Sequence, residues 1–181
     1  ITMEPEDNPP MSGSNSICVA TVLLEKNLIP MQEPVTEFFL EAPGGLVKVE
    51  AECSHNKIKE IKIENLPSYV HKFEETIEVE EFGSVTVSTV FGGDSFVICN
   101  ASDFNLSIHP SFAKDFVRTS SKILKAANEQ LGFFHPKLKK LNFISFCQFV
   151  EPVILNDRGI KEAKNTVCIR PGKLDRSPCG T

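Results

Sequence analysis

Two short stretches of small residues carry the side chains best suited to nucleophilic or proton-transfer chemistry. Residues 11–16 read Met-Ser-Gly-Ser-Asn-Ser and place Ser12 just before an apolar run, and residues 177–181 read Ser-Pro-Cys-Gly-Thr and contain Cys179. Each stretch could open a helix. Free N–H groups and the helix dipole at such a start favour an anion, for example a carboxylate or a phosphate. For the first stretch, an ordinary capped core helix is the alternative.

The elements that must position these residues follow from the apolar pattern. Residues 17–24 are apolar or small on every side, which predicts a buried central helix over about 14–26. Period-two alternation and turn residues then predict a meander of short antiparallel strands near this helix. A Lys- and Arg-bearing amphipathic helix is expected from about 112 to 131. The expected strands are 36–40, 46–53, 58–65, 77–80, 84–90, 95–99, 142–150 and 166–170.

Composition excludes several classes of protein. The chain has 181 residues and a net charge of -5, so no basic face for nucleic acid is implied. The residues of this chain show neither a signal-peptide pattern nor an apolar run of transmembrane length, so we expect neither feature. Its six cysteines lack CxxC spacing, and most lie in apolar strand-like runs, which argues against a zinc site or a disulfide framework. We therefore expect a cytoplasmic protein with no metal and no membrane or nucleic-acid partner.

The two small-residue stretches resemble the motifs of the proline racemase family. Residues 11–15 read Met-Ser-Gly-Ser-Asn where the family has Met-Cys-Gly-His-Gly or Met-Cys-Gly-His-Asn. Residues 175–181 read Asp-Arg-Ser-Pro-Cys-Gly-Thr, as in the family's second motif. Segments 40–47, 91–94 and 126–136 are also similar to family segments. The resemblance covers nearly the whole chain.

The resemblance implies an α+β fold like that of diaminopimelate epimerase. Such a fold has two pseudo-symmetric halves, each a curved, mostly antiparallel sheet around a central helix, with the site between them. We expect residues 1–110 to form most of the first half. Residues 111–181 would supply a covering or linking helix and part of the second half. The chain is then interpreted as a fragment, since a helix after Cys179 and strands at both ends are expected in addition.

The resemblance also implies cofactor-free chemistry at the α-carbon of a proline-like amino acid. It assigns Cys179 the role of the base that removes the α-proton, and Ser12 the place of the second catalytic residue. A thiol is suited to this role because its pKa falls at a helix N-terminus. Asp175 would hold the ring nitrogen. The substrate carboxylate would bind the residues that open the two helices, namely Gly13, Ser14, Gly180 and Thr181.

Ser12 departs from the family pattern, which has cysteine at this position. A serine hydroxyl is a poor base at neutral pH, so two-base racemisation is disfavoured. Loss of a 3-hydroxyl, as in a trans-3-hydroxy-L-proline dehydratase, is slightly favoured. Hydroxyproline 2-epimerase and proline racemase activities stay open because an activated Ser12 could still protonate the opposite face. Ser14 replaces the family histidine, which leaves specificity undecided.

Two non-catalytic alternatives are an imino-acid-binding homologue and a generic carboxylate-binding module. The intact motif around Cys179 favours an enzyme over both, because a pure binder needs no free thiol. His135 and Phe91 are candidate substrate contacts, whereas Asp94 is interpreted as structural and Cys18 as a core residue of the first helix. Family members tend to pair, so a homodimer is left open.

Overall fold

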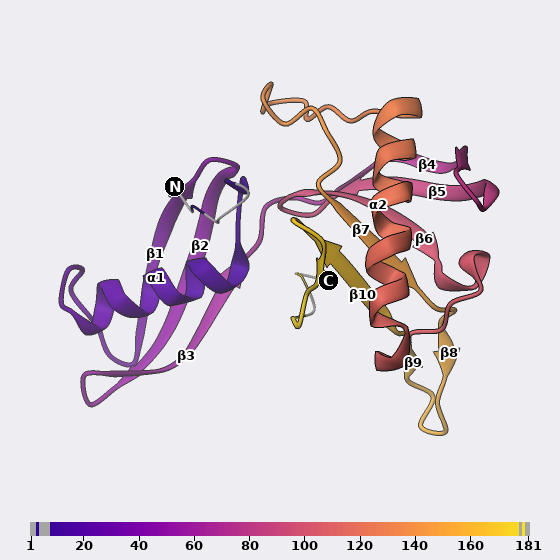
Figure 1. Cartoon of the computed structure of the whole chain (residues 1–181). Coiled ribbons are helices and arrows are strands. Elements are labelled where there is room, and N and C mark those ends of the chain that lie inside the picture. The colour runs from indigo at the N-terminus through magenta and orange to yellow at the C-terminus, as the bar shows by residue number, and fades with distance from the viewer. Residues whose placement is uncertain (1–2, 4–7, 178, 180–181) are drawn as a thin grey trace. The chain divides into compact units, whose positions relative to one another are not determined.

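The computed structural model describes residue 3, residues 8–177 and residue 179. The chain forms two compact units, of which the first ends at Pro67 and the second runs from Ser68 to Cys179. Each unit combines a mostly antiparallel sheet with one α-helix, which confirms the predicted α+β class (Figure 1).

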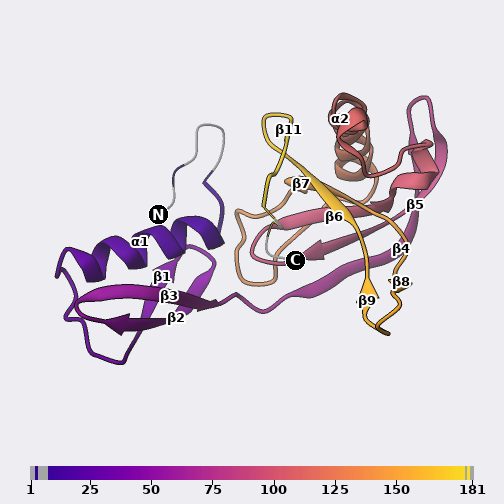
Figure 2. The same cartoon turned by 90° about the horizontal axis from the view of Figure 1, so that it is seen from below.

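The first unit is a three-stranded meander with a helix on one face. Helix α1 covers Gly13–Glu25, and the strands are β1 (Val35–Ala42), β2 (Gly45–Ser54) and β3 (Lys57–Glu64). All neighbours are antiparallel, in the order β1-β2-β3. Figure 2 shows α1 lying along the face of this sheet. The helix ends as expected near Asn27, which has the left-handed φ of 55° that often follows a helix.

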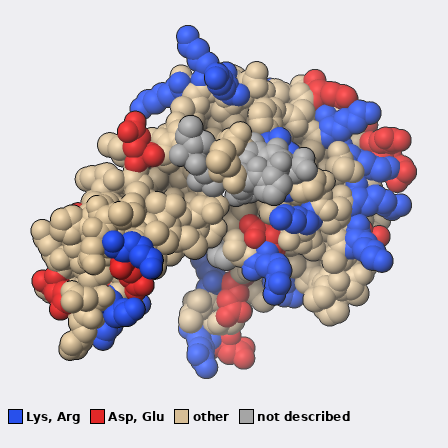
Figure 3. Space-filling model, turned by 60° about the vertical axis from the view of Figure 1, so that its left-hand side comes forward, with Lys and Arg blue, Asp and Glu red and all other residues tan. Residues whose placement is uncertain are grey.

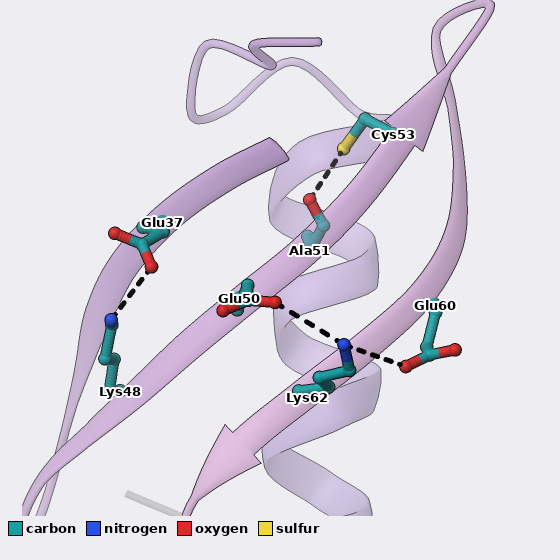
Figure 4. Close-up of polar contacts among 7 residues, drawn as sticks. All are labelled: Glu37, Lys48, Glu50, Ala51, Cys53, Glu60 and Lys62. Atoms are coloured by element: carbon teal, nitrogen blue, oxygen red, sulfur yellow. Dashed lines mark hydrogen bonds and ion pairs between the residues drawn. The ribbon is translucent and has the colours of Figure 1, made fainter. Parts of the chain in front are cut away.

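Strand β2 shows why this sheet has one face buried against the helix (the dry face) and one face exposed to solvent (the wet face). Its buried side chains alternate with more exposed ones along the strand, as the sequence period predicts. On the wet face, Lys48 pairs with Glu37 at 2.8 Å, and Lys62 lies 3.6 Å from Glu50 (Figure 4). Such exposed ion pairs add little stability. The dry face is therefore the part of the sheet that holds α1 in place.

The core of the first unit joins that dry face to the helix. Leu24 of α1 is fully buried against Ala51 and Cys53 of β2. The Cys53 thiol donates to the carbonyl of Ala51 at 3.4 Å (Figure 4). His55 and Asn56 connect β2 to β3 and both have positive φ, the geometry of a tight two-residue hairpin turn.

The second unit is built on a six-stranded sheet. Its order is β11-β10-β7-β6-β5-β4, and helix α2 packs on β4, β6, β7, β10 and β11. The elements are β4 (Tyr69–Val79), β5 (Gly83–Phe91), β6 (Ser95–Asn100), the 3-10 turns η1 (Ala101–Phe104) and η2 (Pro110–Phe112), α2 (Ala113–Gln130), β7 (Phe146–Val150), β8 (Ile154–Leu155), β9 (Lys161–Glu162), β10 (Asn165–Ile169) and β11 (Lys173–Leu174). Strands β8 and β9 form a separate short hairpin.

Helix α2 connects the only two parallel neighbours among the described strands. Strands β6 and β7 run parallel, which is possible because the chain returns through α2 between them. The helix presents Phe116 to the sheet, where its ring lies 4.8 Å from that of Phe149 on β7. Its buried residues are Phe116, Thr119, Ser120, Ile123, Ala126 and Ala127. The amphipathic covering helix predicted for this segment is therefore present.

The second unit also contains three strands, β4, β5 and β6, that were expected to lie in the same half of the fold as α1. Strands β4, β5 and β6 pair with one another and then with β7, so residues 68–110 belong with the later part of the chain. The pairing of β6 explains this, since β6 pairs with β5 on one side and with β7, which begins at Phe146, on the other. The division of the full-length protein into two halves stays a prediction.

Two surface properties bear on the expected partners. Basic and acidic side chains are interspersed on the face shown in Figure 3. Neither α1 nor α2, the α-helices that the described residues form, is long and apolar enough to cross a membrane.

Candidate active site

Ser12 stands immediately before α1, but its side chain does not cap the helix. Its backbone is extended, with φ -135° and ψ 115°, and its carbonyl accepts from the Ser16 amide at 2.9 Å. The hydroxyl makes no capping hydrogen bond and instead accepts from Nδ2 of Asn15 at 2.8 Å. Gly13 and Ser14 follow as the first two helical residues, so both occupy the helix start that the sequence predicts.

The outer face of α1 differs from the prediction of a helix buried on every side. Ala20 and Leu24 are fully buried, whereas Ile17, Val19 and Val22 are 38%, 48% and 54% exposed. A single three-stranded sheet can cover only one face of a helix, which accounts for the difference. For the same reason Cys18 is exposed and not a core residue, contrary to the sequence interpretation.

The second motif forms a compact turn after β11. The Asp175 amide donates to the carbonyl of Val167 at 2.8 Å, which anchors the motif to β10. The Asp175 carboxylate accepts from the amide of Ser177 at 2.9 Å and from its hydroxyl at 3.0 Å. Ser177 Oγ in turn accepts from the Cys179 amide at 3.0 Å. Asp175 thereby orders the backbone that carries the thiol.

Cys179 is partly exposed and has a left-handed φ of 53°. Burial acts to raise the pKa of Asp175, but hydrogen bonds from the Ser177 amide, the Cys179 thiol, the Ser177 hydroxyl and the Arg176 backbone outweigh it, so that this pKa is lowered. Asp175 is therefore an ionised carboxylate at neutral pH and accepts a hydrogen bond from the Cys179 thiol. A carboxylate in this state can bind a substrate ammonium group. Gly180 and Thr181, predicted to bind the substrate carboxylate, lie outside the described residues.

The structure brings the predicted residues together in three groups, one in the first unit and two in the second. Ser12, Gly13 and Ser14 gather at the start of α1 in the first unit. In the second unit, Asp175 and Cys179 lie in one turn, and the rings of Phe91 and His135 contact each other. Phe91 and His135 have ring centroids 4.6 Å apart.

His135 is a neutral, fixed side chain in its loop. Its Nδ1 accepts from the amides of Lys137 and Leu138 at 3.1 and 3.0 Å, which leaves the ring proton on Nε2. Burial, and then the charge of Lys137, lowers the pKa of His135. Tyr69 completes the cluster, since its ring stacks on Phe91 at 5.5 Å. Tyr69 was not singled out from the sequence, because a lone tyrosine at a strand start carries no signal of its own.

The second unit also contains a polar cluster formed by Asp94, Ser95, Ser145 and Arg170. Of these four residues, the sequence analysis singled out only Asp94. Asp94 is buried and its Oδ1 accepts from the hydroxyl of Ser145 at 2.6 Å and from the amide of Ser95 at 2.7 Å. Arg170 donates to Ser145 Oγ at 3.4 Å and lies over the Phe143 ring, 4.7 Å from its centroid. The structural role predicted for Asp94 agrees with these bonds.

The remaining cysteines are core residues, as expected from their strand positions. Cys53, Cys99, Cys147 and Cys168 are buried free thiols. Burial raises the pKa of Cys147 well above its usual range and that of Cys168 to about 11. Thiols held protonated in this way are poor nucleophiles. Within residues 3, 8–177 and 179, no three His, Cys, Asp or Glu side chains gather as a metal site.

Comparison with known proteins places this geometry in a family. The model of the family described as proline racemase matches residues 1–181. The crystal structure of a probable proline racemase from Agrobacterium radiobacter K84, with bound carbonate, has a TM-score of 0.85 and 28% identity, covering 98% of this chain and 51% of that one. A hydroxyproline epimerase from Agrobacterium vitis, with bound trans-4-hydroxy-L-proline, has a TM-score of 0.85 and 30% identity, covering 98% and 50%.

A methylitaconate-delta-isomerase has a TM-score of 0.53 at 16% identity, with 97% of this chain and 56% of that one covered, and shows a likeness of fold alone. The chain spans about half the length of these solved structures. Because the family model extends over all 181 residues, the resemblance inferred from the two motifs is confirmed. The chain belongs to the proline racemase family.

Proposed function

We propose that the full-length protein is a cofactor-independent trans-3-hydroxy-L-proline dehydratase that forms pyrroline-2-carboxylate. One observation carries this proposal: the first catalytic position holds Ser12, whose hydroxyl accepts a hydrogen bond from Asn15, while Cys179 keeps a thiol beside Asp175. One face of the substrate would then meet a competent base and the other face a hydroxyl. Such an asymmetric pair suits elimination better than inversion.

The start of α1 supports binding of the substrate carboxylate. No acidic residue lies in its first turn, and the Ser12 side chain does not cap it. Backbone N–H groups at Gly13 and Ser14 and the helix dipole would then favour a carboxylate. The substrate ammonium group would bind Asp175, which is ionised at neutral pH.

The elimination needs only one thiol. In trans-3-hydroxy-L-proline the α-proton and the 3-hydroxyl lie on the same face of the ring, because the hydroxyl and the carboxylate are on opposite faces. The Cys179 thiolate takes the α-proton, the electron pair left on the α-carbon forms a double bond to C3, and the C3–O bond breaks. The thiol is on the right face to return its proton to the leaving hydroxide, which departs as water. The enamine then takes a proton at C3 and loses the proton on its ring nitrogen, which gives pyrroline-2-carboxylate.

Ser12 would limit the competing reaction. Inversion requires an acid on the opposite face that gives a proton to the α-carbon and is readily regenerated. A hydroxyl is a much weaker acid than a thiol. After deprotonation, elimination would therefore outrun reprotonation from that side.

A 4-hydroxyproline 2-epimerase is the second candidate. It is favoured by the similar Agrobacterium vitis structure, which is described as a hydroxyproline epimerase with bound trans-4-hydroxy-L-proline. A 4-hydroxyl is not adjacent to the deprotonated carbon and cannot leave in the same step. On this substrate the same residues could only exchange or invert the α-proton.

The deciding experiment offers trans-3-hydroxy-L-proline, trans-4-hydroxy-L-proline and L-proline to the full-length protein in D2O. Pyrroline-2-carboxylate from the first substrate is the expected result. Deuterium uptake with inversion of the second, without elimination of the first, would establish the epimerase, and the same result with L-proline would establish a racemase. Neither exchange nor elimination with any substrate would overturn the enzyme and leave an imino-acid-binding homologue.

A further inference from the structure

The Ser12 side chain is held in an unusual way for a residue that precedes a helix. A serine at this position normally accepts from a backbone N–H of the first turn. Here the hydroxyl accepts from the Asn15 side chain at 2.8 Å, and it makes no capping bond. In the ordinary reciprocal arrangement, the side chain three residues on accepts from the backbone of the first residue. Asn15 occupies that position but donates to the hydroxyl.

This bond makes the Ser12 hydroxyl an acceptor towards Asn15, so that the hydroxyl can donate its own proton to a different group. The amide nitrogen of Asn15 has protons to give and no lone pair to offer, so Ser12 Oγ must be the acceptor. Its own O–H proton is not used in the Asn15 contact and is left to be donated to another group. The Ser12 carbonyl is held as well, by the Ser16 amide at 2.9 Å. Main chain and side chain of Ser12 are therefore both fixed from within the first turn of α1.

We propose that Asn15 is a positioning residue that presents the Ser12 hydroxyl as a hydrogen-bond donor to the negative charge that develops on the substrate as its α-proton leaves. This inference rests on the proposed function. The charge spreads from the α-carbon into the carboxylate, which the start of α1 is expected to hold. A donor that is oriented beforehand stabilises such charge more than it stabilises the ground state, so its loss lowers kcat rather than raising KM.

The proposal differs from a purely structural role for Asn15, namely that the side chain only tightens the start of α1. A structural role predicts lower thermal stability and no dependence on Ser12. A positioning role predicts that Asn15 matters only while Ser12 has its hydroxyl. The kinetics of paired variants separate the two.

The test uses the full-length protein and measures kcat and KM on the substrate that the deuterium experiment identifies. Asn15→Ala is expected to lower kcat about tenfold, the factor that loss of one hydrogen bond gives, with KM changed by less than about twofold. Asn15→Asp should lower kcat further, because it replaces the donor by an acceptor and adds a negative charge. Asn15→Gln keeps a donor and should recover part of the activity.

Thr21→Ala is the matched control, since Thr21 also lies on α1 but its hydroxyl donates to the carbonyl of Ile17. It should leave both constants unchanged. In a Ser12→Ala background, Asn15→Ala should have no further effect on kcat. An Asn15 effect that persists without the Ser12 hydroxyl, or an Asn15→Asp variant with normal kcat, would overturn the inference. Either result would leave the proposed function intact, because that function rests on a serine at position 12, on Cys179 and on wild-type turnover, and not on an effect of Asn15 on Ser12.

Discussion

The carboxylate of Asp94 accepts a 2.6 Å hydrogen bond from the hydroxyl of Ser145, which follows it by 51 residues. Ser145 also donates its amide to Ser95 Oγ at 3.0 Å, and Arg170 donates to its hydroxyl. These bonds fasten the start of β7 to the start of β6 and to the end of β10. Residues that are far apart in the sequence are thus held together close to the end of β10, shortly before the second motif begins.

We expect Ser145→Ala to lower the free energy of unfolding by about 1–3 kcal/mol, because it leaves a buried carboxylate without one of its donors. Urea unfolding of the full-length protein measures this. Ser121→Ala is the control, since Ser121 is exposed and bonds only the Arg118 carbonyl of its own helix. Equal losses for both variants would contradict a special role for the Asp94 cluster.

The cysteines should differ sharply in their reactivity towards iodoacetamide. In a Cys18→Ser background, which removes the exposed thiol of α1, Cys179 should be labelled in the native protein. Cys147 and Cys168 should react only after unfolding, because burial raises the pKa of both. Pyrrole-2-carboxylate, a planar substrate analogue, should protect Cys179. Peptide mass spectrometry gives the labelled positions, and unprotected labelling of Cys179 would count against a family-type site.

The catalytic assignments predict opposite outcomes for two substitutions. Cys179→Ser should abolish turnover, because no other described thiol is both exposed and within the second motif. Ser12→Cys should introduce or raise epimerase or racemase turnover, because it supplies an acid for the opposite face. Both are measured by α-proton exchange in D2O. An unchanged rate in Ser12→Cys would show that Ser12 does not limit the two-base route.

Gly13 should be needed for activity and dispensable for folding. A Cβ at this position would meet only Ile63 Cδ1 at the ordinary distance of 3.5 Å, so Gly13→Ala should change stability by less than about 0.5 kcal/mol. Activity should fall at least about tenfold if the substrate carboxylate approaches this backbone closely. Gly83→Ala is the opposite control, because its φ of 73° makes alanine strained without touching the motifs. Full activity in Gly13→Ala would argue against the assigned carboxylate site.

Stability should fall on mild acidification because of two histidines. Burial lowers the pKa of His71 and of His135 below 6.5, with a smaller effect from Lys72 and Lys137 respectively. The unfolded chain then binds more protons, so this stabilisation is complete above pH 6.5 and is lost as the pH falls through the folded-state pKa values. Unfolding titrations at several pH values measure the slope. His71→Gln and His135→Gln should each reduce the slope of the unfolding free energy against pH. An unchanged slope in both variants would refute the assignment of this pH dependence to the two histidines.

Local patterns predicted most of the elements. The β2–β3 hairpin follows from alternating side chains and the polar tip predicted at residues 54–57, and its register is fixed by Val47, Val49 and Ala51 on one face. Helix α2 follows from its apolar period. These features depend on near neighbours in sequence, which is why a single sequence suffices to predict them.

Pairing between segments that are far apart in the sequence was harder to predict. Nothing in residues 95–100 indicates a parallel partner beyond a helix, so the place of β6 in the second unit could not be predicted. Ser145 carries no signal either, because its role depends on Asp94 across the sheet. At the candidate site, the motifs located Ser12 and Cys179, but the Asn15 bond required the side-chain geometry of the first turn.

The parallel pairing of β6 and β7 has a consequence for how the chain folds during synthesis. The first unit closes through contacts within residues 13–64, so it can form early as the chain leaves the ribosome. Strand β6 can pair with β5 as soon as it emerges, but its parallel pairing with β7 waits for α2 and β7, and the described sheet also needs β10 and β11. The turn that carries Cys179 follows β11, and so the thiol can become ordered on this sheet only after β10 and β11 have emerged.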